Sequence, residues 1–173
     1  MSTYTLIQSQ TLASSAASVT FSAIPTTYTD LVLRVSARDT SGVSIADIQG
    51  NWNTSSSGYS ETFLRGNAST AASGRVYTQI AWGASGWISS DAPGDTANTF
   101  GSTEIYIPNY TVAAAKPQSV FSVQESNSAS TGVFISTMAM LWNNTATISS
   151  MLIQASGAFD IGSSFYLYGI SNS

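Results

Sequence analysis

Apolar residues along this chain recur at every second position, which is the period of a β-strand rather than that of a helix. The clearest case is the segment Asp30–Arg38, which reads DLVLRVSAR. Its alternation places Leu31, Leu33, Val35 and Ala37 on one face and Val32, Arg34, Ser36 and Arg38 on the other. We therefore predict a half-buried strand in this segment.

Ten further segments have a strand-like composition, and clusters of Gly, Pro, Asn and Ser separate them. The predicted strands are Tyr4–Gln8, Ser18–Phe21, Ile45–Trp52, Tyr59–Leu64, Val76–Trp82, Thr103–Ile107, Val120–Gln124, Val133–Leu141, Ile148–Gln154 and Ser163–Ile170. The last of them carries apolar residues on both faces, so we expect it to be an interior or interface strand. The run Ser85–Thr99 is predicted to be the longest loop.

Helical signals are weak in this chain. Ala113–Ala115 could start one helical turn, but Lys116-Pro117 favours extended backbone directly after it. Many short strands without helices are typical of an antiparallel two-sheet sandwich, for which a jelly roll is the expected topology. At 173 residues the chain fits one domain, spanning residues 1–173.

The amino-acid composition argues against some classes of binding partner. The chain has five basic and nine acidic residues, a net charge of −4, and a hydrophobic fraction of 43%, which is enough for a core. The basic residues are scattered, so we expect no nucleic-acid partner and no binding to anionic membranes. The first residues do not resemble a signal peptide, and no apolar run is long enough to span a membrane. We expect the protein to be made in a cytoplasm.

The absence of His and Cys removes the usual nucleophile–base systems of enzymes. Asp91 and Asp95 are the nearest carboxylate pair, and glycosidases use such pairs. However, Asp in a loop rich in Ser, Gly and Pro is more often a turn-former. Asp91, Asp95 and Glu104 could also bind Ca²⁺, but their spacing matches neither an EF-hand nor a repeat-type calcium loop. We therefore predict no catalytic residue, no metal ion and no cofactor.

The chain has four Trp, eight Tyr and seven Phe. Trp and Tyr can stack on sugar rings, fill a core or anchor a protein interface. Trp82 lies near the end of a predicted strand, and Trp87 follows it in the sequence WGASGW. Trp82, Trp87 and Ile88 are our candidate residues for a partner interface.

Three segments together carry a family resemblance: Thr11–Arg38, Asn98–Ser126 and Ala139–Ser173. Their most distinctive strings are TYTDLVLRVSAR, STEIYIPNY and GSSFYLYGI. They resemble small virion proteins of tailed bacteriophages, especially phages of cyanobacteria and other aquatic bacteria. The similarity covers more than half of the chain and includes no catalytic motif.

The resemblance implies a jelly-roll virion structural protein, of the kind that decorates a capsid as a cement protein. Its implied partner is the major capsid protein, its implied assembly is a homotrimer, and its implied location is the outer surface of the capsid. The protein would be made in the cytoplasm of the host bacterium. The alternative function is a receptor- or carbohydrate-binding module of a phage fibre or tail tip. An exposed platform of Trp or Tyr that lines a groove would favour this alternative.

Overall fold

The computed structural model describes residues 3–42, 46–67, 70–124 and 134–171, and every regular element among them is a strand. The strands are β1 (Thr3–Thr11), β2 (Ala16–Phe21), β3 (Asp30–Ala37), β4 (Ala46–Trp52), β5 (Tyr59–Asn67), β6 (Thr70–Gln79), β7 (Ser89–Ser90), β8 (Gly101–Ile107), β9 (Lys116–Val123), β10 (Phe134–Trp142), β11 (Met151–Phe159) and β12 (Ser164–Ser171). Within these residues there is no helix that could cross a membrane.

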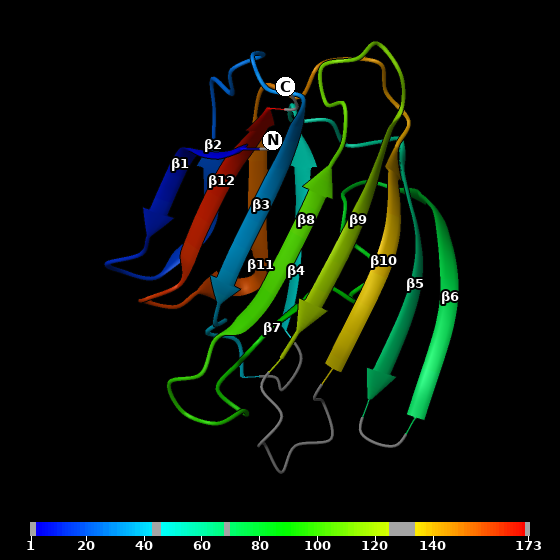
Figure 1. The fold of residues 1–173 in the computed structure, drawn as a ribbon. Helices are drawn as coiled ribbons and strands as arrows, with labels where there is room; N and C mark the ends of the chain where they lie inside the picture. The colour runs from blue at the N-terminus through cyan, green and yellow to red at the C-terminus, as the bar shows by residue number, and fades with distance from the viewer. Residues whose placement is uncertain (1–2, 43–45, 68–69, 125–133, 172–173) are drawn as a thin grey trace.

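The strands form two sheets, and the smaller sheet lies behind the larger in Figure 1. The larger sheet has eight strands in the order β1-β12-β3-β8-β9-β10-β5-β6, and the smaller has four in the order β2-β11-β4-β7. All neighbouring strands within these sheets pair antiparallel. The predicted antiparallel two-sheet sandwich is therefore confirmed.

Eight of the strands alternate between the two sheets along the chain. Strands β1, β3, β8 and β12 belong to the large sheet, and β2, β4, β7 and β11 belong to the small sheet. The other four strands form two hairpins, β5–β6 and β9–β10, which both lie in the large sheet. Because β9 pairs with β8 and β10 pairs with β5, the hairpins continue the large sheet beyond β8.

Strand β3 shows how the alternation in the sequence builds the core. The four residues predicted to face inward are at most 3% exposed, whereas Arg34 on the other face is exposed. Val32 is also buried, although it lies on the same face as Arg34. Its cross-strand neighbours are Tyr168 and Tyr106, and the large rings on both sides account for its burial.

Aromatic pairs fill the space between the sheets. The rings of Trp52 and Trp82 stack at 5.1 Å, and those of Phe159 and Phe165 meet edge to face at 4.8 Å. All four side chains are essentially inaccessible to solvent. Burial of each large apolar side chain contributes about 1.5–3 kcal/mol, so these pairs are a main source of stability.

The segment 80–99 contacts the inward-facing side chains of the two hairpins. Glu61 of β5 accepts a hydrogen bond from the backbone N–H of Gly83, and the hydroxyl of Ser136 in β10 donates to the carbonyl of Trp87. Ser122 of β9 accepts a hydrogen bond from the backbone N–H of Ser89. The run Ser85–Thr99 therefore differs from the predicted loop, because it includes the short strand β7 and is tied to the large sheet.

Other strand boundaries also differ from the prediction. Strand β6 covers Thr70–Gln79 instead of the predicted Val76–Trp82. The sequence did not reveal these bounds, because the small, mostly exposed residues of the strand show no alternation of apolar and polar types. Strand β11 begins at Met151, and the buried Ile148 precedes it outside the strand. Strand β9 begins four residues earlier than predicted, at Lys116, so the extended backbone expected at Lys116-Pro117 is confirmed. The predicted strand ends Ile45 and Val133 lie outside the described residues.

Candidate functional site

Two of the three predicted interface residues lie in the core. Trp82 and Ile88 are both 0% exposed, so neither offers a side chain to a partner. Trp82 stacks on Trp52 and forms an isolated bridge with Gly50 of β4. The predicted roles of Trp82 and Ile88 at an interface are therefore corrected, because packing between the sheets takes up both side chains.

Trp87 is half-buried and packs on the inward side of β5 and β10. The guanidinium of Arg65 lies 3.5 Å from the centre of the Trp87 ring, and the ring of Phe63 lies 5.3 Å from it. Phe134 adds an edge contact at 6.0 Å. A cation–π contact of this kind stabilises the local packing. A role of Trp87 at an interface stays a prediction.

The carboxylate of Asp95 holds the backbone of its own turn. A carboxylate oxygen of Asp95 accepts a hydrogen bond from the N–H of Ala92 at 2.8 Å, which is the turn-forming role predicted for it. The Arg38 guanidinium donates to the carbonyls of Ala92, Thr96 and Thr99 at 2.7–3.1 Å. This segment is therefore held by structural hydrogen bonds, several of them from one buried arginine.

We expect that adding EDTA will leave the melting temperature of the protein unchanged. In the part of the chain that the structure describes, no group of three Asp or Glu residues could hold a metal ion. Glu104 lies on β8 and pairs with Arg34 at 2.8 Å, apart from the Asp95 turn. Differential scanning calorimetry with and without EDTA checks this. A fall of several degrees that Ca²⁺ reverses would contradict the prediction.

The outer face of the eight-stranded sheet carries two groups of side chains that lie in one cross-strand row. Tyr166 of β12 is opposite Arg34 of β3, and Arg34 is opposite Glu104 of β8. Glu104 is in turn opposite Phe121 of β9. The row therefore passes from aromatic and charged residues over β12, β3 and β8 to apolar residues over the hairpins.

The first group is the tyrosine face, which we define as Tyr4, Tyr166, Tyr168, Arg34 and Glu104. The rings of Tyr166 and Tyr168 are 6.5 Å apart and inclined by 23°, and the ring of Tyr4 meets that of Tyr168 at 6.3 Å and 68°. The Arg34 guanidinium lies 5.9 Å from the Tyr4 ring and 5.8 Å from the Tyr168 ring. Two rings, one from the first strand and one from the last, thus lie beside one cation.

A hollow of about 500 Å³ lies within the tyrosine face. It is lined by Arg34, Val35, Ser36, Ser102, Thr103, Glu104, Tyr166 and Tyr168. The Arg34 and Glu104 side chains are 53% and 45% exposed, so their ion pair contributes little to stability. Their exposed donors and acceptors are available to a ligand instead.

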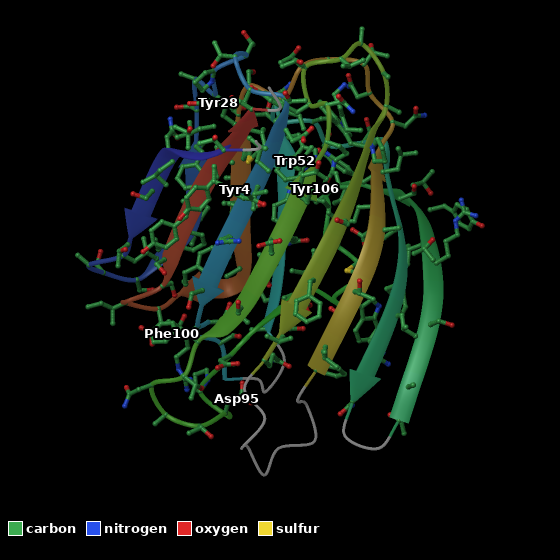
Figure 2. The ribbon with its side chains drawn as sticks, viewed as in Figure 1. Tyr4, Tyr28, Trp52, Asp95, Phe100 and Tyr106 are labelled. Carbon is green, nitrogen blue, oxygen red and sulfur yellow. The ribbon has the colours of Figure 1, made fainter. Side chains whose placement is uncertain are left out.

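Tyr106 borders this region on β8, and Figure 2 shows it on the same side of the sheet as Tyr4. Its hydroxyl donates to Asp30 at 2.8 Å, and Asp30 also accepts from the N–H of Asn109. Burial and this carboxylate raise the pKa of Tyr106 to about 12. Tyr106 therefore stays a neutral phenol that holds the start of β3, and its hydroxyl is already engaged.

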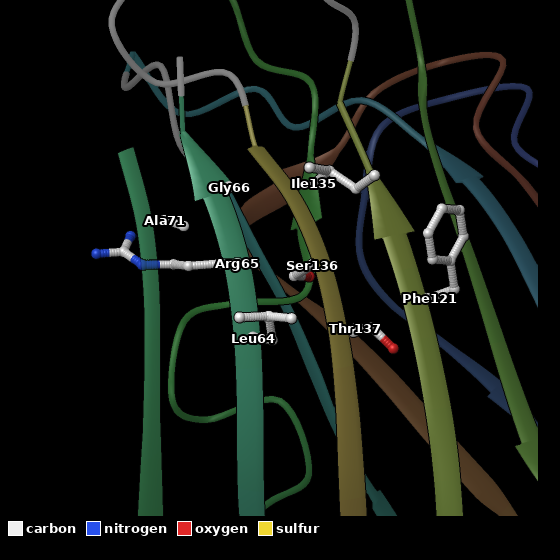
Figure 3. Close-up of a pocket in the computed structure, with 8 residues that line it drawn as sticks. All are labelled: Leu64, Arg65, Gly66, Ala71, Phe121, Ile135, Ser136 and Thr137. Atoms are coloured by element: carbon white, nitrogen blue, oxygen red, sulfur yellow. The ribbon is translucent and has the colours of Figure 1, made fainter. Parts of the chain in front are cut away.

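The second group is the apolar patch, which we define as Leu64, Phe121 and Ile135. These side chains are 55%, 50% and 51% exposed and come from β5, β9 and β10. Together with Arg65, Gly66, Ala71, Ser136 and Thr137 they line a hollow of about 260 Å³. Figure 3 shows the side chains of these residues. The patch contains no charged side chain among its three members.

Both borders of the large sheet are irregular. The pairing of the edge strand β1 with β12 shifts register between Leu6 and Gln8. The pairing of the opposite edge strand β6 with β5 shifts register between Tyr59 and Glu61. Bulges of this kind twist an edge strand and hinder the addition of further strands. The outer face of the sheet is therefore a more suitable contact surface than its edges.

No protein-family model matches this chain, and no curated protein is detectably similar to it in sequence. The residues of the tyrosine face and the apolar patch are therefore assigned from geometry alone. The sequence predicted apolar residues on both faces of the last strand, but it revealed neither the neighbours of Tyr166 and Tyr168 nor the apolar patch. Those neighbours depend on cross-strand register, which apolar periodicity does not reveal.

Proposed function

We propose that this protein is a virion structural protein of a tailed bacteriophage, which decorates the capsid and bridges subunits of the major capsid protein. The observation that carries the proposal is the apolar patch of Leu64, Phe121 and Ile135 on the outer face of the sheet. We infer the type of particle, a tailed-phage virion, from the resemblance of three segments of the sequence to small phage virion proteins.

The apolar patch suits contact with the capsid because it is apolar and uncharged. Contact with a protein partner would remove three half-exposed apolar side chains from water. Depletion of charge is typical of the centre of protein interfaces, where an unpaired buried charge costs several kcal/mol. We assign the patch to the capsid shell.

A patch of three side chains is small compared with the roughly 800 Å² that each partner buries in a stable interface. An assembly of several copies compensates for this, because linked patches bind with far higher overall affinity than one patch alone. We therefore propose that the protein forms a closed homotrimer that presents three apolar patches to the shell.

The fold that we infer for the eight alternating strands is a jelly roll. Two features support it: the orders β1-β12-β3-β8 and β2-β11-β4-β7, and the regular change of sheet from one strand of this set to the next. Double-sheet jelly rolls of eight strands are frequent in viral capsid proteins. In this interpretation β5–β6 and β9–β10 are insertions, and the apolar patch lies on the inserted part.

The double substitution Leu64→Ser, Ile135→Ser should weaken binding to capsids that lack the protein. Each change removes about 1 kcal/mol of apolar burial, so three linked patches should lose well over tenfold in affinity. Co-sedimentation of the purified protein with undecorated capsids measures this loss. Particles without the protein should assemble but rupture at a lower temperature.

The matched control is Ile161→Ser, which changes an apolar side chain of similar exposure, 58%, outside the apolar patch. It should bind capsids as the unsubstituted protein does. Equal capsid binding by the double variant would refute the assignment of the patch. Particles that lack the protein, keep intact heads and fail to adsorb to the host would refute the decoration function.

The second candidate function is a receptor- or carbohydrate-binding module of a fibre or tail tip. The tyrosine face favours it, because Tyr166 and Tyr168 line a hollow that is also lined by a cation and a carboxylate, Arg34 and Glu104. The loss of host adsorption described above is the result that would select this function over decoration.

A further inference from the structure

The tyrosine face has the components of a ligand site: a hollow of about 500 Å³, aromatic rings beside it, and charged and hydroxyl groups within it. Small-molecule sites commonly have volumes in this range and few polar groups. We propose that the tyrosine face binds a neutral saccharide. This inference does not depend on the decoration function; it rests on the second candidate function, whose site it uses, and adds the class of saccharide.

The rings supply the contact surface. Tyr4 is 53% exposed, and Tyr166 and Tyr168 are half-buried, with their rings 6.5 Å apart along β12. One side of a pyranose ring presents several C–H groups, which carry a partial positive charge. The faces of aromatic rings carry a partial negative charge, so they attract such C–H groups while both surfaces lose contact with water.

The polar groups match sugar hydroxyls, which donate and accept hydrogen bonds. Arg34 engages Glu104 through Nε at 2.8 Å, so within the described residues its two terminal amino groups remain as donors. Glu104 supplies acceptors, and the hydroxyls of Ser36 and Ser102 can serve either role. Hydrogen bonds to charged groups are stronger than those between neutral groups, which favours this pair as the centre of the site.

The charge of the site selects the class of saccharide. Arg34 and Glu104 neutralise each other, so the site offers no net positive charge to a uronic or sialic acid. The whole chain carries a net charge of −4, which disfavours the approach of an acidic polymer. Neither of these two electrostatic effects disfavours the binding of a neutral hexose chain.

The site is also rigidly supported. Its residues project from β12, β3 and β8, whose opposite face is the most buried part of the core. Arg34 is held by the ion pair with Glu104 and lies near the rings of Tyr4 and Tyr168. Little side-chain freedom is therefore lost on binding, which is the condition for useful affinity from a small contact area.

The test uses the full chain in affinity electrophoresis through gels that contain one polysaccharide each: neutral glucan, galactan or mannan, and acidic alginate or polygalacturonate. At least one neutral polymer should retard the protein. Tyr166→Ala and Tyr168→Ala should each weaken this binding about tenfold, which corresponds to about 1.4 kcal/mol. Tyr168→Phe retains the ring and should bind nearly as well as the unsubstituted protein.

Tyr77→Ala is the matched control, because Tyr77 is 60% exposed and lies 4.2 Å from the Arg75 guanidinium, yet it belongs to β6. It should bind as the unsubstituted protein does. The Leu64→Ser, Ile135→Ser variant should also keep saccharide binding, which separates this proposal from the decoration function. Retardation by acidic polymers alone, by none of the polymers, or equally in Tyr166→Ala would overturn the proposal.

Discussion

A chain that ends at Ser163 should fail to fold. The truncation removes β12, which lies between β1 and β3 in the large sheet. Phe165 and Leu167 of this strand are both 0% exposed, and burial of each contributes about 1.5–3 kcal/mol. The strand also provides the pairing partner of β1 and one partner of β3. The two side chains alone account for about 3–6 kcal/mol, and the lost strand pairing adds to this, so the total loss is comparable with the roughly 5–15 kcal/mol by which a domain is stable.

Circular dichroism and thermal melting of the truncated chain measure this effect. The matched control is a chain that lacks residues 1–11, and therefore the edge strand β1, whose residues are exposed or only half-buried. We expect the control to keep a cooperative melting transition at a lower temperature. A cooperative transition in the chain without β12 would show that this strand is not essential to the core.

Gly50→Ala should destabilise the protein by more than about 3 kcal/mol, which for this length lowers the melting temperature by about 10 °C. A Cβ atom at Gly50 would lie 1.9 Å from the carbonyl oxygen of Leu152 and 2.5 Å from the Trp82 ring. The backbone cannot easily move away, because Gly50 exchanges two hydrogen bonds with Trp82 at 2.9 and 3.0 Å. The added methyl group must therefore separate β4 from β11 or displace Trp82.

The control for this substitution is Gly42→Ala, because among the described residues, its chain neighbours aside, no atom lies within 4 Å of a Cβ at Gly42. Its melting temperature should stay within a degree or two of that of the unsubstituted protein. Near-ultraviolet circular dichroism of Gly50→Ala should also lose the signal of the stacked Trp52 and Trp82 rings. A Gly50→Ala protein that melts like the control would mean that β4 and β11 adjust at little cost.

Most strands could be predicted from the sequence, including the edge strands β1 and β2, whereas the extent of β6 and the short strand β7 could not. Strands β3, β8 and β12 bury one face, so apolar residues recur at every second position in them. Strand β6 is an edge strand without a buried face, and its sequence TAASGRVYTQ carries no such pattern. Strand β7 has two residues, which is too short for any period to be visible.

The surface sites were less predictable than the fold. The residues around a tryptophan in a sequence of Ser and Gly, such as Trp82, do not show whether its side chain is buried or exposed. The stack on Trp52 that buries it depends on the approach of β4, which is distant in the sequence. The tyrosine face has the same dependence, because Tyr4 and Tyr168 come from opposite ends of the chain and meet only when β1 pairs with β12.

The pairing of the two hairpins also bears on the order in which they were added during the evolution of the fold. Hairpin β9–β10 adds directly to β8, whereas β5–β6 joins the described sheet only through β10. If both hairpins were added one at a time, each to the free edge of an ancestral frame of eight strands, β9–β10 was acquired first, although β5–β6 precedes it in the sequence. Descendants of that ancestor can then carry neither hairpin, β9–β10 alone, or both, and a lineage that carries β5–β6 alone would require a later loss.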